Sequence, residues 1–295
     1  MCGIGGVSLN IPIREKEAEV VERMLSSLHR RGEHSFGYMY ATGMDYEMYK
    51  EPGPYWRSHV HTILPSELID EGPSEIGLHT RYATQGDPSK NQNNHPFDFG
   101  NFVMAHNGVF YRTEEFDNPT NIETDSFWAL YWIQREYENL GEDPNRTAEA
   151  IEKGIEHVVG AFAIWLYNKD NGKVYLFRNA LKPTKTAIIQ GDNYYLFASD
   201  RDAINDALGL DMKFGMDGVI GADVGGTRTL REGRLRVKNI RPLPPHTIYS
   251  LKEGRMYREK IMRPKPVSPE VRMRFRDDYA HLYSRDYNSS MPLRV

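Results

Sequence analysis

The sequence predicts an α+β fold in which stacked antiparallel sheets are covered by helices. Short runs of β-branched and aromatic residues recur in both halves of the chain at hairpin-like spacing. Segments with helical periodicity lie between them, but without the regular alternation of strand and helix that a parallel sheet requires. The 295 residues are 39% hydrophobic, so the chain can bury one large core or two smaller ones.

The first expected elements are a strand over residues 3–9 and an amphipathic helix over 15–29 that stops at Arg31-Gly32. The helix carries apolar residues at helical spacing, namely Val20, Val21, Met24, Leu25 and Leu28. Short strands are expected next at 37–41, 76–83 and 102–106. Residues 85–100 are rich in Pro, Asn, Gly and Asp, which predicts a loop too long for a simple hairpin.

A second helix is expected to begin near Thr124. Because apolar groups surround it almost completely, we place it inside the protein between layers. The strands that follow are expected at 160–167, 174–178, 186–190 and 194–198, with a helix at 200–208. From about Met256 the hydrophobic periodicity fades. We therefore divide the chain into a domain over 2–255 and a basic C-terminal tail over 256–295 that is extended or docked on a partner.

Composition and charge exclude several classes of protein. No window approaches the ~18 uninterrupted apolar residues of a membrane helix, and no basic segment followed by an apolar run opens the chain. The single cysteine cannot form an internal disulfide, which suits a reducing compartment, so we expect a cytoplasmic protein. The net charge of −4 gives no overall attraction to nucleic acid or acidic membranes.

That single cysteine is Cys2, directly after the initiator methionine. Removal of Met1 would place a thiol and a free α-amine on one residue. An α-amine titrates near ~7.7 to 8.0 and a cysteine thiol near ~8.5, so the amine can accept the thiol proton at neutral pH. Cys2 is therefore a candidate nucleophile with its own base, although a terminal cysteine is more often inert.

Four further segments combine polar residues with small ones where apolar strands end. They are Arg30 to Gly37, His79 to Gly86, Ala105 to Gly108 and Glu123 to Ser126. Each has an ordinary structural explanation when taken alone: Arg31-Gly32 as a helix stop, Asn107-Gly108 as a hairpin turn, Arg81 as a solvated side chain and Asp125 as a first-turn helix residue.

Together with Cys2 these segments resemble the class II glutamine amidotransferases, whose glutaminase domain is an N-terminal-nucleophile hydrolase. The matching motifs occur in the family's order, as Cys2-Gly3-Ile4, Arg31-Gly32 with Ser35 and Gly37, His79 to Thr84, Asn94 to Phe97, His106-Asn107-Gly108 and Thr124-Asp125. Six ordered motifs are a specific signal, and weaker likenesses continue to about Leu251. The opening and the His-Asn-Gly form are most similar to the sugar-amidating and glutamate-synthase-like branches.

The resemblance implies a four-layer αββα sandwich of two antiparallel sheets and a set of roles. Cys2 would attack the side-chain amide of L-glutamine, and Asn107 with the Gly108 backbone N–H would stabilise the oxyanion. Arg81 and Thr84 would bind the substrate α-carboxylate, and Asp125 its α-ammonium group. The Arg31 to Gly37 segment would close over the substrate as a lid, with Arg31 among the binding residues.

Two other patterns were weighed against this one. The histidines at 59, 61, 79, 95 and 106 lack cysteine partners and a His-Glu-x-x-His spacing, so we expect no metal and no other cofactor. Eight basic residues over 255–276 are interleaved with aromatic ones, as in a nucleic-acid-binding arm. A solvated tail or a strap onto a partner explains that pattern better.

The leading hypothesis is a stand-alone glutaminase subunit that produces ammonia for a separately encoded synthase, since no acceptor domain is recognised after residue 260. A hydrolase of γ-glutamyl amides or peptides that needs no partner is the alternative. A non-catalytic regulatory subunit of the same fold is less favoured, because the nucleophile, oxyanion and substrate residues are all present. A homo-oligomer is left open.

Overall fold

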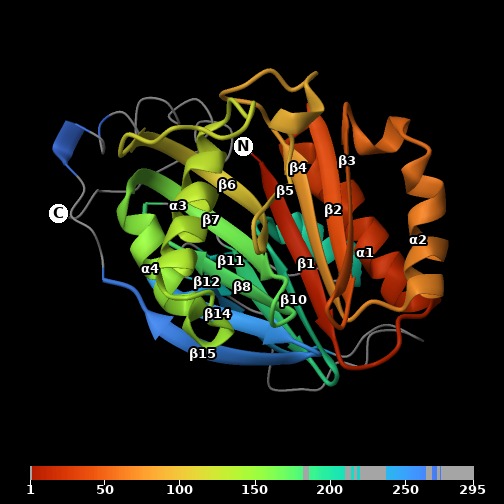
Figure 1. Ribbon diagram of the computed structural model, residues 1–295. Coiled ribbons are helices and arrows are strands. Elements are labelled where there is room, and N and C mark those ends of the chain that lie inside the picture. Colours follow the sequence, from red (N-terminus) through yellow and green to blue (C-terminus); the bar gives the residue numbers. More distant parts are fainter. Residues whose placement is uncertain are drawn as a thin grey trace.

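The computed structural model consists of two stacked antiparallel sheets with helices on both outer faces (Figure 1). It describes residues 2–181, 186–209, 214–215, 218–219, 237–263, 268–270 and 273. The layers follow the order helix, sheet, sheet, helix, so the predicted α+β class and the αββα sandwich are confirmed.

The seven-stranded sheet has the strand order β13-β9-β10-β1-β4-β2-β3. Its strands are β1 (Gly3–Leu9), β2 (Ser35–Thr42), β3 (Asp45–Pro52), β4 (Glu75–Arg81), β9 (Ala187–Gly191), β10 (Tyr194–Ala198) and β13 (Val237–Pro242). β1 lies at its centre, with Gly3 opposite Thr80 on β4 and Gly5 opposite Ala198 on β10. Because β1 runs antiparallel to both neighbours, its first residue emerges where β4 and β10 end.

The six-stranded sheet has the order β15-β14-β8-β7-β6-β5. Its strands are β5 (Phe97–Phe99), β6 (Phe102–Thr113), β7 (Val158–Asn168), β8 (Lys173–Arg178), β14 (Thr247–Lys252) and β15 (Arg255–Ile261). A short separate pair is formed by β11 (Phe214–Gly215) and β12 (Gly218–Val219).

Helices cover the outer face of each sheet. They are α1 (Glu15–Leu28), α2 (Val60–Glu71) and α5 (Arg201–Leu208) on the seven-stranded sheet, and α3 (Asp125–Asn139) and α4 (Thr147–Glu156) on the six-stranded sheet. None of the described helices is long and apolar enough to cross a membrane.

A buried layer between the sheets holds them together. Ile4 from β1 packs there with Val103 and Ala105 from β6 and with Trp165 from β7. The Trp165 indole N–H also donates to the Leu78 carbonyl of the opposite sheet over 3.0 Å. β1 therefore leads its N-terminal residue into the same space that alternate residues of β6 face.

Several expectations need correction. Asn107 and Gly108 lie within β6, which runs to Thr113, so they form no turn and the strand is longer than expected. α3 lies on the outer face and not between layers; its remaining apolar surface is covered by neighbours such as Phe116, which stacks on Tyr131. The loop at 85–100 includes the short strand β5.

The expected boundary at residue 255 falls at the start of β15. β14 and β15 form a hairpin whose turn residues, Glu253 and Gly254, have φ angles of 47° and 66°. A left-handed turn of this kind joins adjacent strands, so the sheet continues to Ile261. The remainder of the expected tail lies outside the described residues, apart from 262–263, 268–270 and 273.

Candidate active site

Cys2 directly precedes β1 and lines one depression with Arg81 at the end of β4 and Gly108 in the middle of β6. Its Sγ accepts from the backbone N–H of Tyr82 at 3.4 Å and donates to the Tyr82 carbonyl at 3.6 Å. The residue is partly exposed. The thiol is therefore held by the peptide units that follow β4 and is still open to a small molecule.

The backbone around Cys2 is fixed by Arg31 and by the junction of β10 with α5. Arg31 Nε donates to the Cys2 carbonyl at 3.1 Å, and its Nη1 pairs with Asp200 at 2.9 Å. The Ile4 N–H donates to the Ser199 hydroxyl at 3.0 Å. Arg31 thus contacts the backbone of Cys2 and does not line the depression described below; its role in binding glutamine stays a prediction.

Arg81, the last residue of β4, is buried with an exposed fraction of 3%. Its guanidinium donates to Asn94 Oδ1 at 2.8 Å and to the carbonyls of Gln85 and Gly86 at 2.5 and 3.0 Å. These bonds use three of the five N–H donors of an arginine. The remaining donors and the rigid orientation of the fork suit a carboxylate ligand.

Asp125 begins α3 and lies at its positive N-terminus. One carboxylate oxygen accepts the Phe110 N–H at 2.6 Å. Burial raises the pKa of Asp125 to about 6, while backbone hydrogen bonds and the charge of Arg81 oppose that rise. Burial thus destabilises the anionic form of this carboxylate, and a cation beside it would stabilise that form.

Asn107 and Gly108 lie side by side on β6. Asn107 is fully buried, and neither its Nδ2 nor its Oδ1 has a hydrogen-bond partner among the described residues. A Cβ on Gly108 would lie 1.9 Å from the Ala161 carbonyl oxygen and 2.5 Å from His106 Nε2, so the backbone here tolerates only glycine.

A depression of about 250 Å³ joins these groups at the end of the sandwich. Its lining includes Cys2, Arg81, Thr84, Gly108 and Asp125, which come from β1, β4, the segment after it, β6 and α3. Five of the seven predicted site residues therefore meet in one place. Arg31 lies behind Cys2, and Asn107 is buried next to Gly108.

Three buried histidines lie beside the depression. The rings of His79 and His95 are 4.1 Å apart, and His79 Nε2 contacts the His106 carbonyl at 3.2 Å. Burial lowers the pKa of His79 to about 3 and that of His95 well below its usual value, so both rings are neutral. Within the described residues, no group of three or more His, Cys, Asp or Glu side chains is arranged to hold a metal ion.

Comparison with known proteins gives the same picture. No family model matches the chain. The glutamine–fructose-6-phosphate aminotransferase of Shouchella clausii is 30% identical over 209 residues, which are 69% of this chain and 33% of that protein. The same-named protein of Pyrobaculum aerophilum is 27% identical over 215 residues, covering 70% of this chain and 34% of its own length. The chain thus spans about a third of the length of these relatives.

Solved structures show the same fold. The glutamine phosphoribosylpyrophosphate amidotransferase of B. subtilis, complexed with ADP and GMP, superposes with a TM-score of 0.55 over 88% of this chain and 50% of its own, at 17% identity. A structure described as the allosteric regulatory enzyme of purine biosynthesis gives 0.59 over 88% and 49%, at 16% identity.

The chain is thus similar in sequence to glutamine-dependent aminotransferases, and its described sandwich has the fold of a glutamine amidotransferase. The relatives that show this are enzymes, and the recognition made from the ordered motifs is confirmed.

Three residues near Cys2 to which the sequence analysis assigned no individual role are Asp200, Ser199 and His34. His34 stacks on Tyr82, with ring centroids 5.0 Å apart and planes inclined by 26°. A Cβ on Gly32 would lie 2.3 Å from the Arg81 carbonyl carbon, so the expected lid segment packs directly on the end of β4. In the sequence, His34, Ser199 and Asp200 are marked only by lying in or near a motif. That position does not reveal which residues of other strands they contact.

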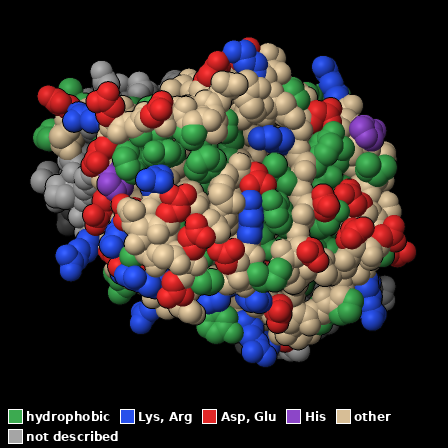
Figure 2. Space-filling model, in the orientation of Figure 1, with side chains coloured by type: hydrophobic (Ala, Val, Ile, Leu, Met, Phe, Trp, Pro, Cys, Tyr) green, Lys and Arg blue, Asp and Glu red, His purple; other side chains and the backbone are tan. Residues whose placement is uncertain are grey.

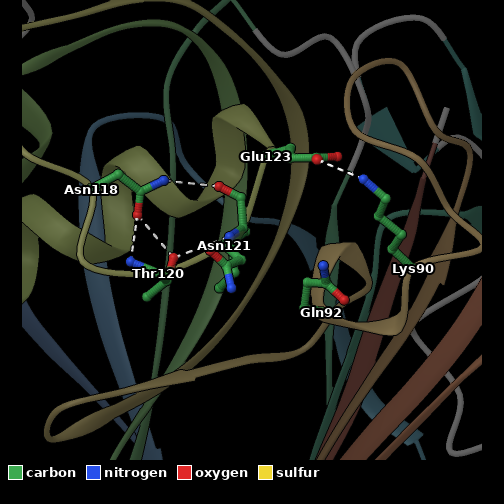
Figure 3. A pocket seen from close by; sticks show the side chains of 7 residues that line it. Lys90, Gln92, Asn118, Thr120, Asn121 and Glu123 are labelled. Atoms are coloured by element: carbon green, nitrogen blue, oxygen red, sulfur yellow. Dashed lines mark hydrogen bonds and ion pairs between the residues drawn. The ribbon is translucent and has the colours of Figure 1, made fainter.

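A second, more open depression of about 760 Å³ lies beside the amidotransferase site (Figure 3). It is lined by Lys90, Gln92, Asn118, Thr120, Asn121, Ile122 and Glu123. Glu123 Oε1 forms an ion pair with Lys90 Nζ over 2.8 Å, and its Oε2 accepts a hydrogen bond from Asn93 Nδ2 over 2.9 Å. Glu123 directly precedes Thr124 and Asp125, so this polar pocket adjoins the depression around Cys2. Acidic and basic side chains are interspersed on the face shown in Figure 2.

Proposed function

We propose that this domain hydrolyses L-glutamine to glutamate and ammonia through a thioester on Cys2. The observation that carries the proposal is that Cys2, Arg81 and Asp125 line one depression although they are far apart in the sequence. The Cys2 thiol, the Arg81 guanidinium and the Asp125 carboxylate would match the side-chain amide, the α-carboxylate and the α-ammonium group of glutamine.

Substrate binding would use the two charged groups. The free N–H donors of Arg81, with Thr84 beside them, would bind the α-carboxylate, and Asp125 would bind the α-ammonium group. Asp125 is buried, and an incoming ammonium would restore the pKa that burial has raised. Charged partners in a buried site orient the ligand strongly, which directs its side-chain amide toward Cys2.

The chemistry would begin after removal of Met1 exposes the Cys2 α-amine. The amine accepts the thiol proton as Sγ bonds to the amide carbon, and the carbonyl oxygen becomes an oxyanion. The C–N bond then breaks, the nitrogen takes the proton from the α-ammonium group, and ammonia leaves the thioester. Water, deprotonated by the same amine, attacks the thioester carbon; the C–S bond breaks, the α-ammonium group returns the proton to Sγ, and glutamate leaves.

Asn107 and Gly108 would stabilise the oxyanion. The Asn107 amide has no partner among the described residues, so its Nδ2 donor is available without breaking another bond. Gly108 lines the same depression as Cys2, and its backbone N–H would be the second donor. Fixed donors of this kind act without reorganisation when charge develops, and each contributes about 10² to 10³ in turnover.

The ammonia would pass to a separately encoded synthase subunit. The described strands and helices form the sandwich itself or the short β11–β12 pair. The direct check is a pull-down from the native host followed by glutaminase assay of the complex.

The decisive experiment measures glutamate released from glutamine by purified protein whose intact mass shows that Met1 has been removed. We expect turnover that is lost in Cys2→Ala. If protein with a free Cys2 amine releases no glutamate, alone or with a co-purifying partner, the proposal fails. Turnover of γ-glutamyl peptides with little use of glutamine would instead favour the partner-independent hydrolase.

A further inference from the structure

We propose that His34 is a positioning residue that orients the Tyr82–Ala83 peptide unit against the Cys2 thiol. The inference rests on the proposed role of Cys2 as nucleophile. It concerns a residue whose side chain lies outside the lining of the depression and which contacts the thiol only through the backbone.

The peptide between Tyr82 and Ala83 is held from both sides. Its carbonyl accepts from Cys2 Sγ at 3.6 Å, and its N–H donates to His34 Nδ1 at 2.9 Å. A trans peptide is planar, and its C=O and N–H point in opposite directions. A bond that fixes the N–H therefore also fixes the direction in which the carbonyl faces the thiol.

His34 is itself fixed well enough to impose this orientation. Its backbone N–H donates to the Arg81 carbonyl at 3.0 Å, and its carbonyl accepts from the Gly53 N–H at 2.8 Å. Its ring stacks on Tyr82 and accepts the Ala83 N–H, so it contacts both residues that this peptide bond joins. The backbone of His34 is thus tied to the last residue of β4 and to the residue that follows β3.

The contact also selects one state of the imidazole. Nδ1 accepts a hydrogen bond only when it carries no proton, so the ring must hold its proton on Nε2. A side chain that lacks an acceptor at this point leaves the Ala83 N–H to solvent, because this contact is exposed. Water does not fix the orientation of the peptide, and the position of the Tyr82 carbonyl at Sγ becomes less defined.

The test compares two variants that separate the acceptor from the ring. His34→Phe keeps a stacking ring but removes Nδ1, whereas His34→Asn keeps an acceptor oxygen of similar reach. Because the sequence contains one cysteine, the rate of alkylation by iodoacetamide reports on the Cys2 thiol alone. His59→Phe, at an exposed histidine on another element, is the matched control.

We expect His34→Phe to lower kcat about 10- to 100-fold, as small misplacements of reacting groups do, with KM changed less than about threefold. Its alkylation rate should change at least about fivefold. His34→Asn should recover both quantities to within about threefold of the wild type, and His59→Phe should match the wild type.

The proposal is overturned if folded His34→Phe keeps the wild-type kcat and alkylation rate, or if His34→Asn is as impaired as His34→Phe. Equal melting temperatures establish that the variants are folded. Alkylation does not depend on turnover. If no variant hydrolyses glutamine but the alkylation rates follow the expected order, the proposed function fails while the positioning role of His34 stands.

Discussion

The side chain of Arg31 donates to the backbone carbonyl of Cys2 over 3.1 Å and so contacts the residue proposed to react, from behind. The same guanidinium pairs with Asp200. This geometry makes Arg31 an anchor of the N-terminal residue, which differs from the substrate-binding role that the motif alone indicated.

Arg31→Lys should therefore lower kcat about 10- to 100-fold with a smaller effect on KM. A lysine keeps the charge but cannot reach Cys2 and Asp200 with one planar fork, and a hydrogen bond to a charged group is worth about 1.5 to 3 kcal/mol. Steady-state glutaminase kinetics measure the effect. Arg30→Lys, at the exposed neighbour that pairs with Asp206, is the control and should stay within about twofold of the wild type.

Asn107→Ala should separate activity from stability. The buried amide has no hydrogen-bond partner among the described residues. Burying such an unsatisfied polar group costs about 1 to 3 kcal/mol of stability, and the substitution removes that cost. We expect an unchanged or higher melting temperature and a kcat lowered about 10² to 10³-fold. A large loss of stability together with normal turnover would contradict the role proposed for this amide.

Glutamine use should fall in acid because of Asp125. Its pKa is raised by burial to about 6 in the empty site, so the carboxyl becomes protonated and neutral below that pH. A neutral carboxyl cannot pair with the α-ammonium group, and kcat/KM should decline about tenfold per pH unit below about 6. The pH profile of kcat/KM tests this. In Asp125→Asn the decline that begins near pH 6 should be absent, while the decline from protonation of the Cys2 α-amine, which titrates near ~8, should remain; a decline near pH 6 that stays in place would belong to another group.

Stability should fall as pH rises because of Glu75. Burial raises its pKa to about 8 in the folded protein, although hydrogen bonds from Ser8 and from the Glu253 N–H oppose that rise. A carboxyl with a raised folded pKa stabilises the fold below its unfolded pKa of about 4.5, and this contribution is lost as pH approaches about 8. Urea unfolding at several pH values measures it.

Replacing that buried acid should flatten the pH dependence. Glu75→Gln keeps an oxygen that can accept from Ser8 and Glu253 but carries no ionisable proton. We expect its free energy of unfolding to change less between pH 5 and about 9 than that of the wild type. Glu47→Gln, on the exposed face of β3, should retain the wild-type slope.

Much of the fold could be predicted because its central strands carry strong local patterns. β1, β4, β7 and β10 lie close to their expected positions, since buried runs of apolar residues mark strands directly. β3, with its exposed charges and Pro52, and α2, with Pro65 inside it, lack clear periodicity and were missed. α3 was expected to lie inside the protein because it carries apolar side chains on nearly all sides. The sequence pattern shows that these side chains are buried but not whether a second sheet or a loop residue such as Phe116 covers them.

The candidate site was predictable as a set of residues but not as a geometry. Motif order selected Cys2, Arg81, Gly108 and Asp125, and the structure brings them to one depression. The contacts of His34 and Asp200 depend on strand register and on the start of α5, which a single sequence does not specify.

Asp200 gives one carboxylate two tasks. One oxygen accepts the Asp202 N–H at the start of α5, and the other holds Arg31 and, through it, the carbonyl of Cys2. Hydrogen bonds thereby connect the first turn of α5 to the backbone of Cys2. If that turn frays while the sandwich is still intact, Cys2 loses its fixed position, so gentle heating should inactivate the protein before it denatures.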